Sequence, residues 1–485
     1  MPIASPARPR PGEPDGVAWL PIAWALGSII VFGVGFFQIS WPYVDAYTRL
    51  NEADRWTWQQ HLPYAFGGGT EYRPLMVLSI KAAYEALGLH LWAYQTLVLL
   101  QLAAVLGLLL WLLRPVGRSR GIAAVIALSC VLGLHTSRIL FLFVPLNAHS
   151  GALALVLLTV ALAFHPRVRT LDWIFLPLTF VALLLLESSL LIVPAVVVLW
   201  RLGAPGLSGR GVVATGIAVL LYVVVRAAFG ASQELSVYTA SGLGFSARDP
   251  DTLRAIFEHA PYVFWIYNVV ATFLTVVLSE PRDGMFASLA SLLAGNVPLW
   301  RWWHVGSSVV TTSVIAIALI RHPAAAVRDR LLLGSGLVLV VFGSALGFLY
   351  TRDRIGLCAG VGYVMILYVA LAGVWEQSPR SAPKRLGWAA VTLVIGFAWL
   401  VRSAETYLYL RDTAWDYHLE WTRRFEELGG LAQTESNVLT SMMSTVLSRT
   451  PDDPRRDPSW TYTLFERRHA RHVETPSPTN VPSAN

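Results

Sequence analysis

The chain has 485 residues, of which 55% are hydrophobic and only 14% are charged, and its formal net charge is +7. Soluble globular domains carry about 25% charged residues, so this composition argues against a soluble enzyme and indicates an integral membrane protein. The basic residues are dispersed among short loops, which argues against a nucleic-acid-binding surface and fits signals of membrane topology.

Residues 1–16 are polar and rich in proline, which predicts a disordered segment before the first span. The apolar stretch that follows is longer than that of a cleaved signal peptide and lacks a small-residue cleavage site, so we expect a retained first helix. The two cysteines, Cys130 and Cys358, each lie within an apolar segment. They form no metal-binding spacing and no disulfide framework, and we expect both to fill the core.

Apolar segments suited to crossing a ~30 Å hydrocarbon core recur along residues 17–402, the predicted membrane domain. The clearest predicted spans are Val17–Phe37, Leu91–Leu113, Gly121–Leu134, Ser150–Phe164, Gly211–Phe229, His304–Ile320, Leu331–Tyr350, Ile355–Trp375 and Leu386–Val401. Basic turns separate many of them, at Arg114/Arg118/Arg120, Arg167/Arg169, Arg201/Arg210, Arg321/Arg328/Arg330 and Arg380/Lys384/Arg385. The positive-inside rule predicts that these turns and the N-terminus are cytoplasmic.

The segment Leu171–Trp200 has basic residues on both flanks, so it is expected to enter the membrane and return to the same side. As one straight helix it would be about 45 Å long, which is too long for a comfortable span. We therefore predict two short helices with a turn near Glu187, at their non-cytoplasmic end. Because an unpaired carboxylate is costly at membrane depth, Glu187 is predicted to be hydrated, paired or functional.

The alternation of membrane sides set by the basic turns does not decide the topology of Phe257–Leu278. This segment is either an interfacial or re-entrant helix, or a span paired with Met285–Leu299. The predicted fold is an all-α polytopic membrane protein with about 11 spans, or about 13 with the extra pair. Both odd numbers leave the C-terminus outside the cytoplasm. Within residues 403–485 we predict a helix to about Leu428, followed by a disordered tail.

The first outer loop, residues 38–90, carries the strongest functional pattern, because it sets carboxylates and an arginine among many aromatic residues. Asp45 follows the first span closely, and is either a solvated loop acid or a general base that takes a proton from an acceptor hydroxyl. Arg73 stands in the segment EYRPL with Glu71 and Tyr72, and the proline after it predicts an extended backbone. Its guanidinium group either reaches lipid headgroups or holds a phosphate.

Other outer segments add candidates. Arg352 and Arg354 flank Asp353 between two spans, and are either neutralised by that acid or offer a second cationic contact for a phosphate or pyrophosphate. His135 lies at another outer turn, and either lines the same cavity or is an interfacial histidine without a role in the site. An amphipathic helix near the membrane interface is predicted at Leu75–Leu89. No zinc-protease, nucleophile-elbow, P-loop or Rossmann pattern occurs, so no metal ligand and no cofactor are predicted, and a need for a divalent cation stays open.

The order of these motifs resembles that of membrane glycosyltransferases of the GT-C fold. The chain is most similar to bacterial relatives of the TMTC-type O-mannosyltransferases, and more loosely similar to PMT and ArnT-like enzymes. The motifs are VDAY after the first span, EYRPL, LHTSRILFLF, LLLLESSLLIVPAVVVLW, AVLLYVVVRAAFG and YTRDRIGLCAG. The resemblance covers residues 17–428.

The resemblance implies a GT-C-like bundle with interfacial helices in the first outer loop. It implies inverting transfer of a sugar from a polyprenyl-phosphate carrier to an acceptor hydroxyl, on the non-cytoplasmic face of the plasma (inner) membrane. The family's first-loop acid corresponds to Asp45, its YRP arginine to Arg73 and its hairpin acid to Glu187. The expected substrate-binding residues are Glu71, Tyr72, Arg73, Glu187, Arg352, Arg354 and His135. Two departures are Val44, where the family often has a second acid, and a late motif that is only echoed here.

Two other functions stay open. One is a transporter or flippase for a lipid-linked or small anionic solute, and the other is an inactive GT-C-fold scaffold. The expected partners are a lipid-linked sugar donor, membrane lipid and an acceptor that is a protein, a lipid or a glycan. The sequence specifies neither the sugar nor the acceptor.

Overall fold

The computed structural model describes residues 19–38, 44–67, 72–88, 90–141, 148–230, 242–243, 246–247, 249–257, 260–278, 291–295, 297, 299–351, 355–377 and 382–427. Helices dominate these residues, and one small hairpin pairs β1 (Gly242–Leu243) with β2 (Ser246–Ala247). Within this part of the chain, six helices are long and apolar enough to cross a membrane, or seven if one bent pair counts as a span. The protein is therefore an α-helical polytopic membrane protein, as the composition predicted.

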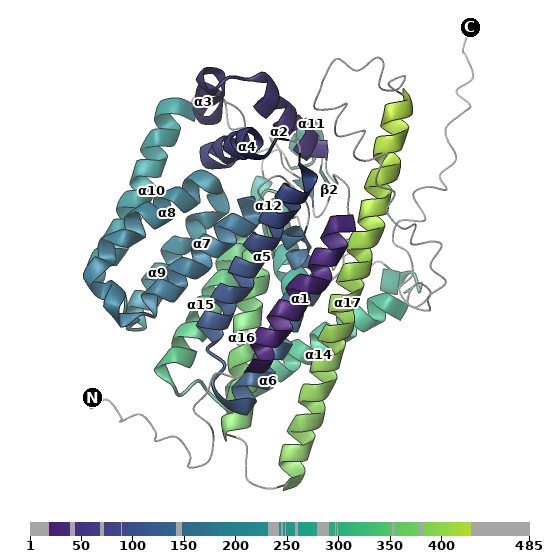
Figure 1. The fold of residues 1–485 in the computed structure, drawn as a ribbon. Coiled ribbons are helices and arrows are strands. Elements are labelled where there is room, and N and C mark those ends of the chain that lie inside the picture. Colours follow the sequence, from purple (N-terminus) through teal and green to yellow (C-terminus); the bar gives the residue numbers. More distant parts are fainter. Residues whose placement is uncertain are drawn as a thin grey trace.

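The helices of the main bundle are packed side by side (Figure 1). They are α1 (Trp19–Gln38), α5 (Leu91–Leu113), α6 (Gly117–Gly133), α7 (Ala148–Ala163), α8 (Phe175–Leu185), α9 (Ile192–Arg201), α10 (Gly209–Gly230), α14 (Leu299–Arg321), α15 (Val327–Ala345), α16 (Leu357–Gln377) and α17 (Ala382–Glu427), with the 3₁₀ helices η1 (His135–Leu140), η2 (Pro166–Ile174) and η3 (Glu187–Leu191). Large apolar side chains such as Ile30, Leu220 and Phe397 stay exposed on the outer helices. Such a surface suits contact with lipid.

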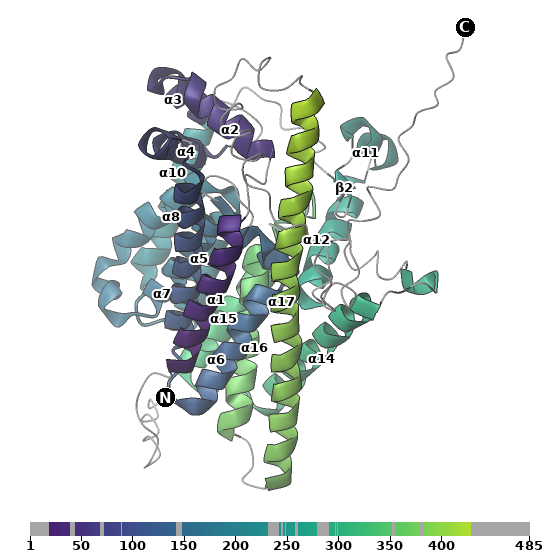
Figure 2. The same ribbon diagram turned by 45° about the vertical axis from the view of Figure 1, so that its right-hand side comes forward.

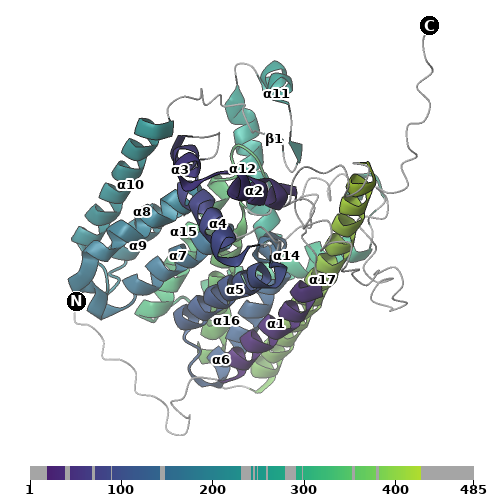
Figure 3. The same cartoon turned by 45° about the horizontal axis from the view of Figure 1, so that its top comes forward.

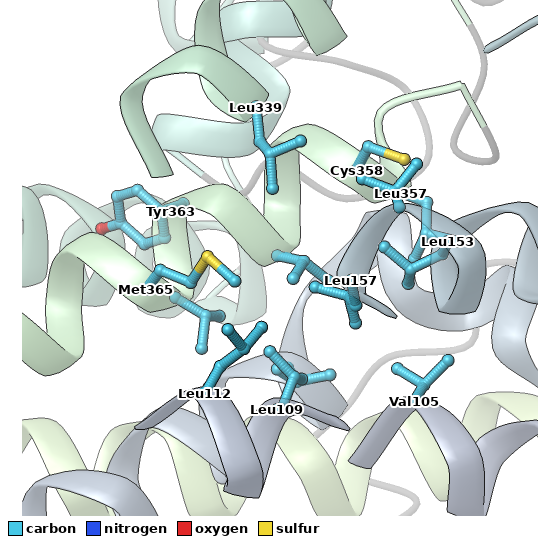
Figure 4. Packing of buried hydrophobic residues seen from close by; sticks show 14 of the residues in the cluster. Val105, Leu109, Leu112, Leu153, Leu157, Leu339, Leu357, Cys358, Tyr363 and Met365 are labelled. Atoms are coloured by element: carbon cyan, nitrogen blue, oxygen red, sulfur yellow. The ribbon is translucent and has the colours of Figure 1, made fainter. Parts of the chain in front are cut away.

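The centre of the bundle is α16, which is buried along nearly its whole length. Glycine lets α15 approach it closely, because a side chain at Gly336 would meet the carbonyl oxygen of Gly362. On another side, Leu109 of α5 and Leu157 of α7 pack toward Met365 (Figure 4). This dry core fixes the positions of the loops at both ends of the bundle.

The basic turns before α6 and α15 meet at one end of the bundle. Arg120 at the start of α6 forms hydrogen bonds with Asp329 of α15 and with Glu376 near the end of α16. Arg328 donates to the last carbonyl oxygens of α5, where a cation suits the helix C-terminus. Turns that the positive-inside rule assigns to one side of the membrane thus contact one another.

The apolar segment around Glu187 breaks where the sequence predicted. Between α8 and η3, Leu186 adopts an extended backbone, and α9 follows directly after η3. The chain then returns to the end from which it came, because the Ser208 hydroxyl after α9 donates to the carboxylate of Asp172 in η2. The predicted pair of short helices with a turn at Glu187 is confirmed.

Three short helices between α1 and α5 lie over the opposite end of the bundle (Figures 1 and 3). They are α2 (Val44–Arg55), α3 (Trp58–Gly67) and α4 (Pro74–Leu87), and we call them the first-loop cap. The Lys81 ammonium group donates to the carbonyl oxygen of Ala53 at 2.7 Å, and the Tyr84 hydroxyl donates to Asp54 at 2.7 Å. These bonds hold α4 against the C-terminal end of α2. The helix predicted after Arg73 is confirmed.

The segment whose topology the sequence left open belongs to a bent pair of helices. The helices α11 (Pro250–Phe257) and α12 (Pro261–Val277) meet at 110°, which fits a broken span or a re-entrant loop.

The 46 residues of α17 form a helix about 69 Å long that runs past the rest of the bundle (Figure 2). The predicted boundary between residues 402 and 403 therefore lies inside a continuous helix.

Candidate functional site

An arginine and a carboxylate from distant segments meet where the first-loop cap contacts the bundle. Arg73 Nε donates a hydrogen bond to Glu187 Oε2 at 3.1 Å, across 114 residues of sequence. The side chains of Arg73 and Glu187 are 20% and 31% exposed, so the pair is neither fully buried nor on an open surface. The structure thus brings two of the predicted site residues into direct contact.

Local structure accounts for the position of each partner. Arg73 is the residue before the first turn of α4, and Pro74 keeps its backbone out of the helix. Glu187 is the first residue of η3, where the break at Leu186 turns its side chain out of the line of α8. The N-terminus of η3 favours a carboxylate. Because α4 packs on α8, the two helix starts lie next to each other.

Two residues of α10, Tyr222 and Arg226, complete this region. Their segment is one of the motifs quoted above, but the sequence reasoning gave neither residue a role. Tyr72 is buried against Tyr222 of α10, and their ring centroids are 5.9 Å apart. Arg226 Nη1 donates to the Tyr222 hydroxyl at 3.2 Å, and the Arg226 guanidinium carbon lies 5.9 Å from the centroid of the Tyr72 ring. We call Tyr72, Arg73, Glu187, Tyr222 and Arg226 the first-loop site.

The electrostatics of the first-loop site are set by burial and by Arg226. Burial raises the pKa of the Tyr72 hydroxyl, and the positive charge of Arg226 partly opposes that shift. Tyr72 is therefore a neutral hydroxyl at physiological pH. Arg226 itself stands in the apolar part of α10, far from the other arginine of this helix, Arg210. An ionisable residue in such a helix is a functional candidate by default, and this signal could have identified Arg226 from the sequence.

The remaining predicted site residues are Asp45, Glu71, Arg352, Arg354 and His135. Asp45 lies in the first turn of α2, but its side chain is outside the described part of the structure, as are Glu71, Arg352 and Arg354. His135 is buried at the start of η1, which packs against α6, α7, α12 and α16. Its neighbours are thus bundle helices.

No group of three or more His, Cys, Asp or Glu side chains that could hold a metal ion occurs among the described residues. The polar groups of the first-loop site are two guanidinium groups, two phenols and one carboxylate. This set suits contacts to a phosphate and to sugar hydroxyls.

No family model matches the chain, and no curated protein and no solved structure matches it either.

Proposed function

We propose that the protein is a membrane glycosyltransferase that moves a sugar from a polyprenyl-phosphate carrier to an acceptor hydroxyl. The observation that carries this proposal is the hydrogen bond between Arg73 and Glu187. The resemblance to GT-C glycosyltransferases gives roles to both residues, and those roles require a common site. Their contact across two distant segments supports that requirement.

In the proposed donor site, positively charged side chains bind the phosphate of the donor. A polyprenyl phosphate leaves more readily when guanidinium groups neutralise the charge that develops on it. Arg226 and Arg73 supply two such groups. Glu187 holds Arg73 in one orientation through its hydrogen bond, and the Tyr222 hydroxyl does the same for Arg226.

Asp45 is the proposed general base. It accepts the proton of the acceptor hydroxyl while the acceptor oxygen attacks the anomeric carbon, and the bond from that carbon to the phosphate oxygen breaks. A single displacement inverts the anomeric centre and needs one carboxylate, whereas retention also needs a nucleophile. Asp45 begins α2, which packs on the helix that Arg73 precedes, so the base and the donor site belong to one cap.

The proposed topology has about 11 crossings, with α8 and α9 as two short ones and α12 as a re-entrant helix. The helices counted are α1, α5, α6, α7, α8, α9, α10, α14, α15, α16 and α17. The N-terminus is then cytoplasmic, and the first-loop cap faces the outer side of the inner membrane. Contacts among the basic turns at the opposite end support this orientation.

The direct experiment is transfer of a labelled sugar from polyprenyl phosphate in proteoliposomes. Asp45→Asn should lower transfer about 100-fold or more, because the carboxylate can no longer take the proton. Asp54→Asn is the matched control, since Asp54 lies on the same helix and only accepts a hydrogen bond from Tyr84. Full activity in Asp45→Asn would remove Asp45 from the mechanism.

One observation favours a second candidate, a transporter of a lipid-linked or anionic solute. Transporters bind substrate at interrupted helices, and the chain has a break at Glu187 and a 110° bend between α11 and α12. Movement of the labelled lipid across the membrane without sugar transfer would favour this function. If the protein supports neither sugar transfer nor lipid movement, the scaffold hypothesis is the one that remains.

A further inference from the structure

A second group of charged side chains is buried between η1, α14 and α17. It consists of Arg138 of η1, His304 of α14, and Arg402 and Glu405 of α17, and each is less than a tenth exposed. We call these four residues the η1–α17 cluster. None belongs to the first-loop site, and charged groups are costly inside an apolar bundle unless they are compensated.

The single carboxylate of the cluster is shared. His304 Nε2 forms a hydrogen bond with Glu405 Oε2, while Arg138 Nη2 lies 3.9 Å from Glu405 Oε1. A separation of 3.9 Å is beyond hydrogen-bond range, so Arg138 and Glu405 have only a long ion pair.

The second guanidinium group of the cluster contacts hydroxyl groups and an aromatic ring. Arg402 Nη1 donates to Ser308 Oγ at 2.7 Å and to Ser307 Oγ at 3.2 Å. The Arg402 guanidinium carbon lies 4.2 Å from the centroid of the Trp399 ring. These contacts hold the Arg402 side chain in place.

Arg138 is the least satisfied member. It is 2% exposed, yet its Nε and Nη1 atoms have no hydrogen-bond partner among the described residues. One face of its guanidinium group is covered by Tyr409, whose ring centroid lies 3.9 Å away. Buried guanidinium donors without acceptors cost free energy, because the water they lose is not replaced. A bound anion would change this situation, because it would supply oxygen acceptors for the Nε and Nη1 donors of Arg138.

We propose that the η1–α17 cluster is an anion site at which Arg138 binds a phosphate group. The planar fork of a guanidinium group matches two phosphate oxygens, and Tyr409 holds that fork from one face. The group is either the phosphodiester of a lipid headgroup or a free dihydrogen phosphate ion. The site does not depend on glycosyl transfer, since it shares no residue with the first-loop site.

The test uses the full chain purified in a maltoside detergent, which contains no phosphate. A chloride salt keeps the ionic strength constant. One arm adds inorganic phosphate and the other adds phosphatidylglycerol to the micelles. We expect at least one probe to raise the unfolding temperature of the wild type. A response to inorganic phosphate alone identifies the free ion, and a response to phosphatidylglycerol alone identifies the headgroup.

Arg138→Gln should lower the apparent affinity for the effective probe about 10- to 100-fold, as expected for losing charge-assisted hydrogen bonds. Arg254→Gln is the matched control, because the Arg254 side chain is 57% exposed on α11, and it should respond like the wild type. If Arg138→Gln does not fold, Arg138→Lys, which keeps the charge but loses the fork, should show a weaker shift than the wild type.

A second readout separates this site from a structural ion pair. Without either probe, Arg138→Gln should unfold at the same temperature as the wild type or higher, because it removes a buried guanidinium group with two donors that lack acceptors. The proposal is overturned if neither probe stabilises the wild type. It is also overturned if the wild type and Arg138→Gln respond equally.

Discussion

Two arginine–carboxylate contacts lie at opposite ends of the bundle, and the two ends differ in what surrounds the arginines. Arg120 donates from Nη1 and Nη2 to both oxygens of Asp329 at 3.0 and 2.9 Å. It also donates to both oxygens of Glu376, at 2.5 and 3.1 Å. At the other end, Arg73 Nε donates to Glu187 Oε2 at 3.1 Å, and a second arginine, Arg226, lies beside Tyr72.

The difference separates an arginine that holds helices together from arginines suited to a ligand. Arg120 ties α6, α15 and α16 with four hydrogen bonds, so a further anion would have to break them. At the first-loop site, the contacts described for Arg226 are with a phenol hydroxyl and an aromatic ring. That site therefore offers positive charge, whereas the Arg120 network is already neutralised.

The largest effect on stability is expected at the Arg120 network. Arg120→Met leaves Asp329 buried without its partner, so the free energy of unfolding should fall by about 3 kcal/mol. Thermal or denaturant unfolding in detergent measures this change. Arg118→Met is the control on the same turn, where the side chain is exposed, and it should change stability by no more than about 0.5 kcal/mol. Equal effects of the two substitutions would contradict a structural role for Arg120.

Loss of one positive charge from the first-loop site should instead affect donor binding more than stability. Arg226→Gln is expected to raise the KM for the polyprenyl-phosphate donor about tenfold, with a small change in unfolding temperature. Steady-state transfer kinetics in proteoliposomes measure it. Arg210→Gln, at the other end of α10, is the control and should keep the wild-type KM. If Arg226→Gln mainly destabilised the protein, the two ends would not differ as we infer.

The smallest effect is expected in the first-loop cap at high pH. Burial and the hydrogen bond to Asp54 raise the pKa of Tyr84 to about 12, above its ordinary value of 10.0. The neutral hydroxyl is thus favoured by folding, so its contribution to stability is complete below pH 10 and is lost as the pH rises toward 12.

The unfolding temperature across this pH range is the measurement. Tyr84→Phe should be less stable than the wild type at neutral pH, and the difference should shrink above pH 10. A difference that stays constant with pH would show that the Tyr84 proton does not contribute.

Several parts of the fold followed from local physical rules. Apolar length predicted the membrane bundle, because a span needs about 20 apolar residues. The basic flanks and the excess length of Leu171–Trp200 predicted the break at Glu187, and the residue order Arg73–Pro74 predicted a helix that starts after the arginine. Each of these depends on neighbours in the sequence.

Other features depend on how helices meet, which no single segment encodes. The contact between Arg226 and Tyr72 arises only after α10 packs beside the first-loop cap. Arg402 was expected at the end of a span, yet α17 continues past it and buries both Arg402 and Glu405 against α14 and η1. The predicted convergence of Asp45, Arg352 and Arg354 on the same site stays a prediction.

The most direct measurement is a double-mutant cycle on Arg73 and Glu187, read as kcat/KM for sugar transfer from labelled polyprenyl phosphate. Arg73→Gln and Glu187→Gln should each lower kcat/KM about 10- to 100-fold, with membrane insertion retained. The double variant should lose much less than the product of the two, because the residues act as one unit. Wild-type rates in both single variants, or independent losses that simply multiply, would contradict a shared catalytic site at the first-loop cap.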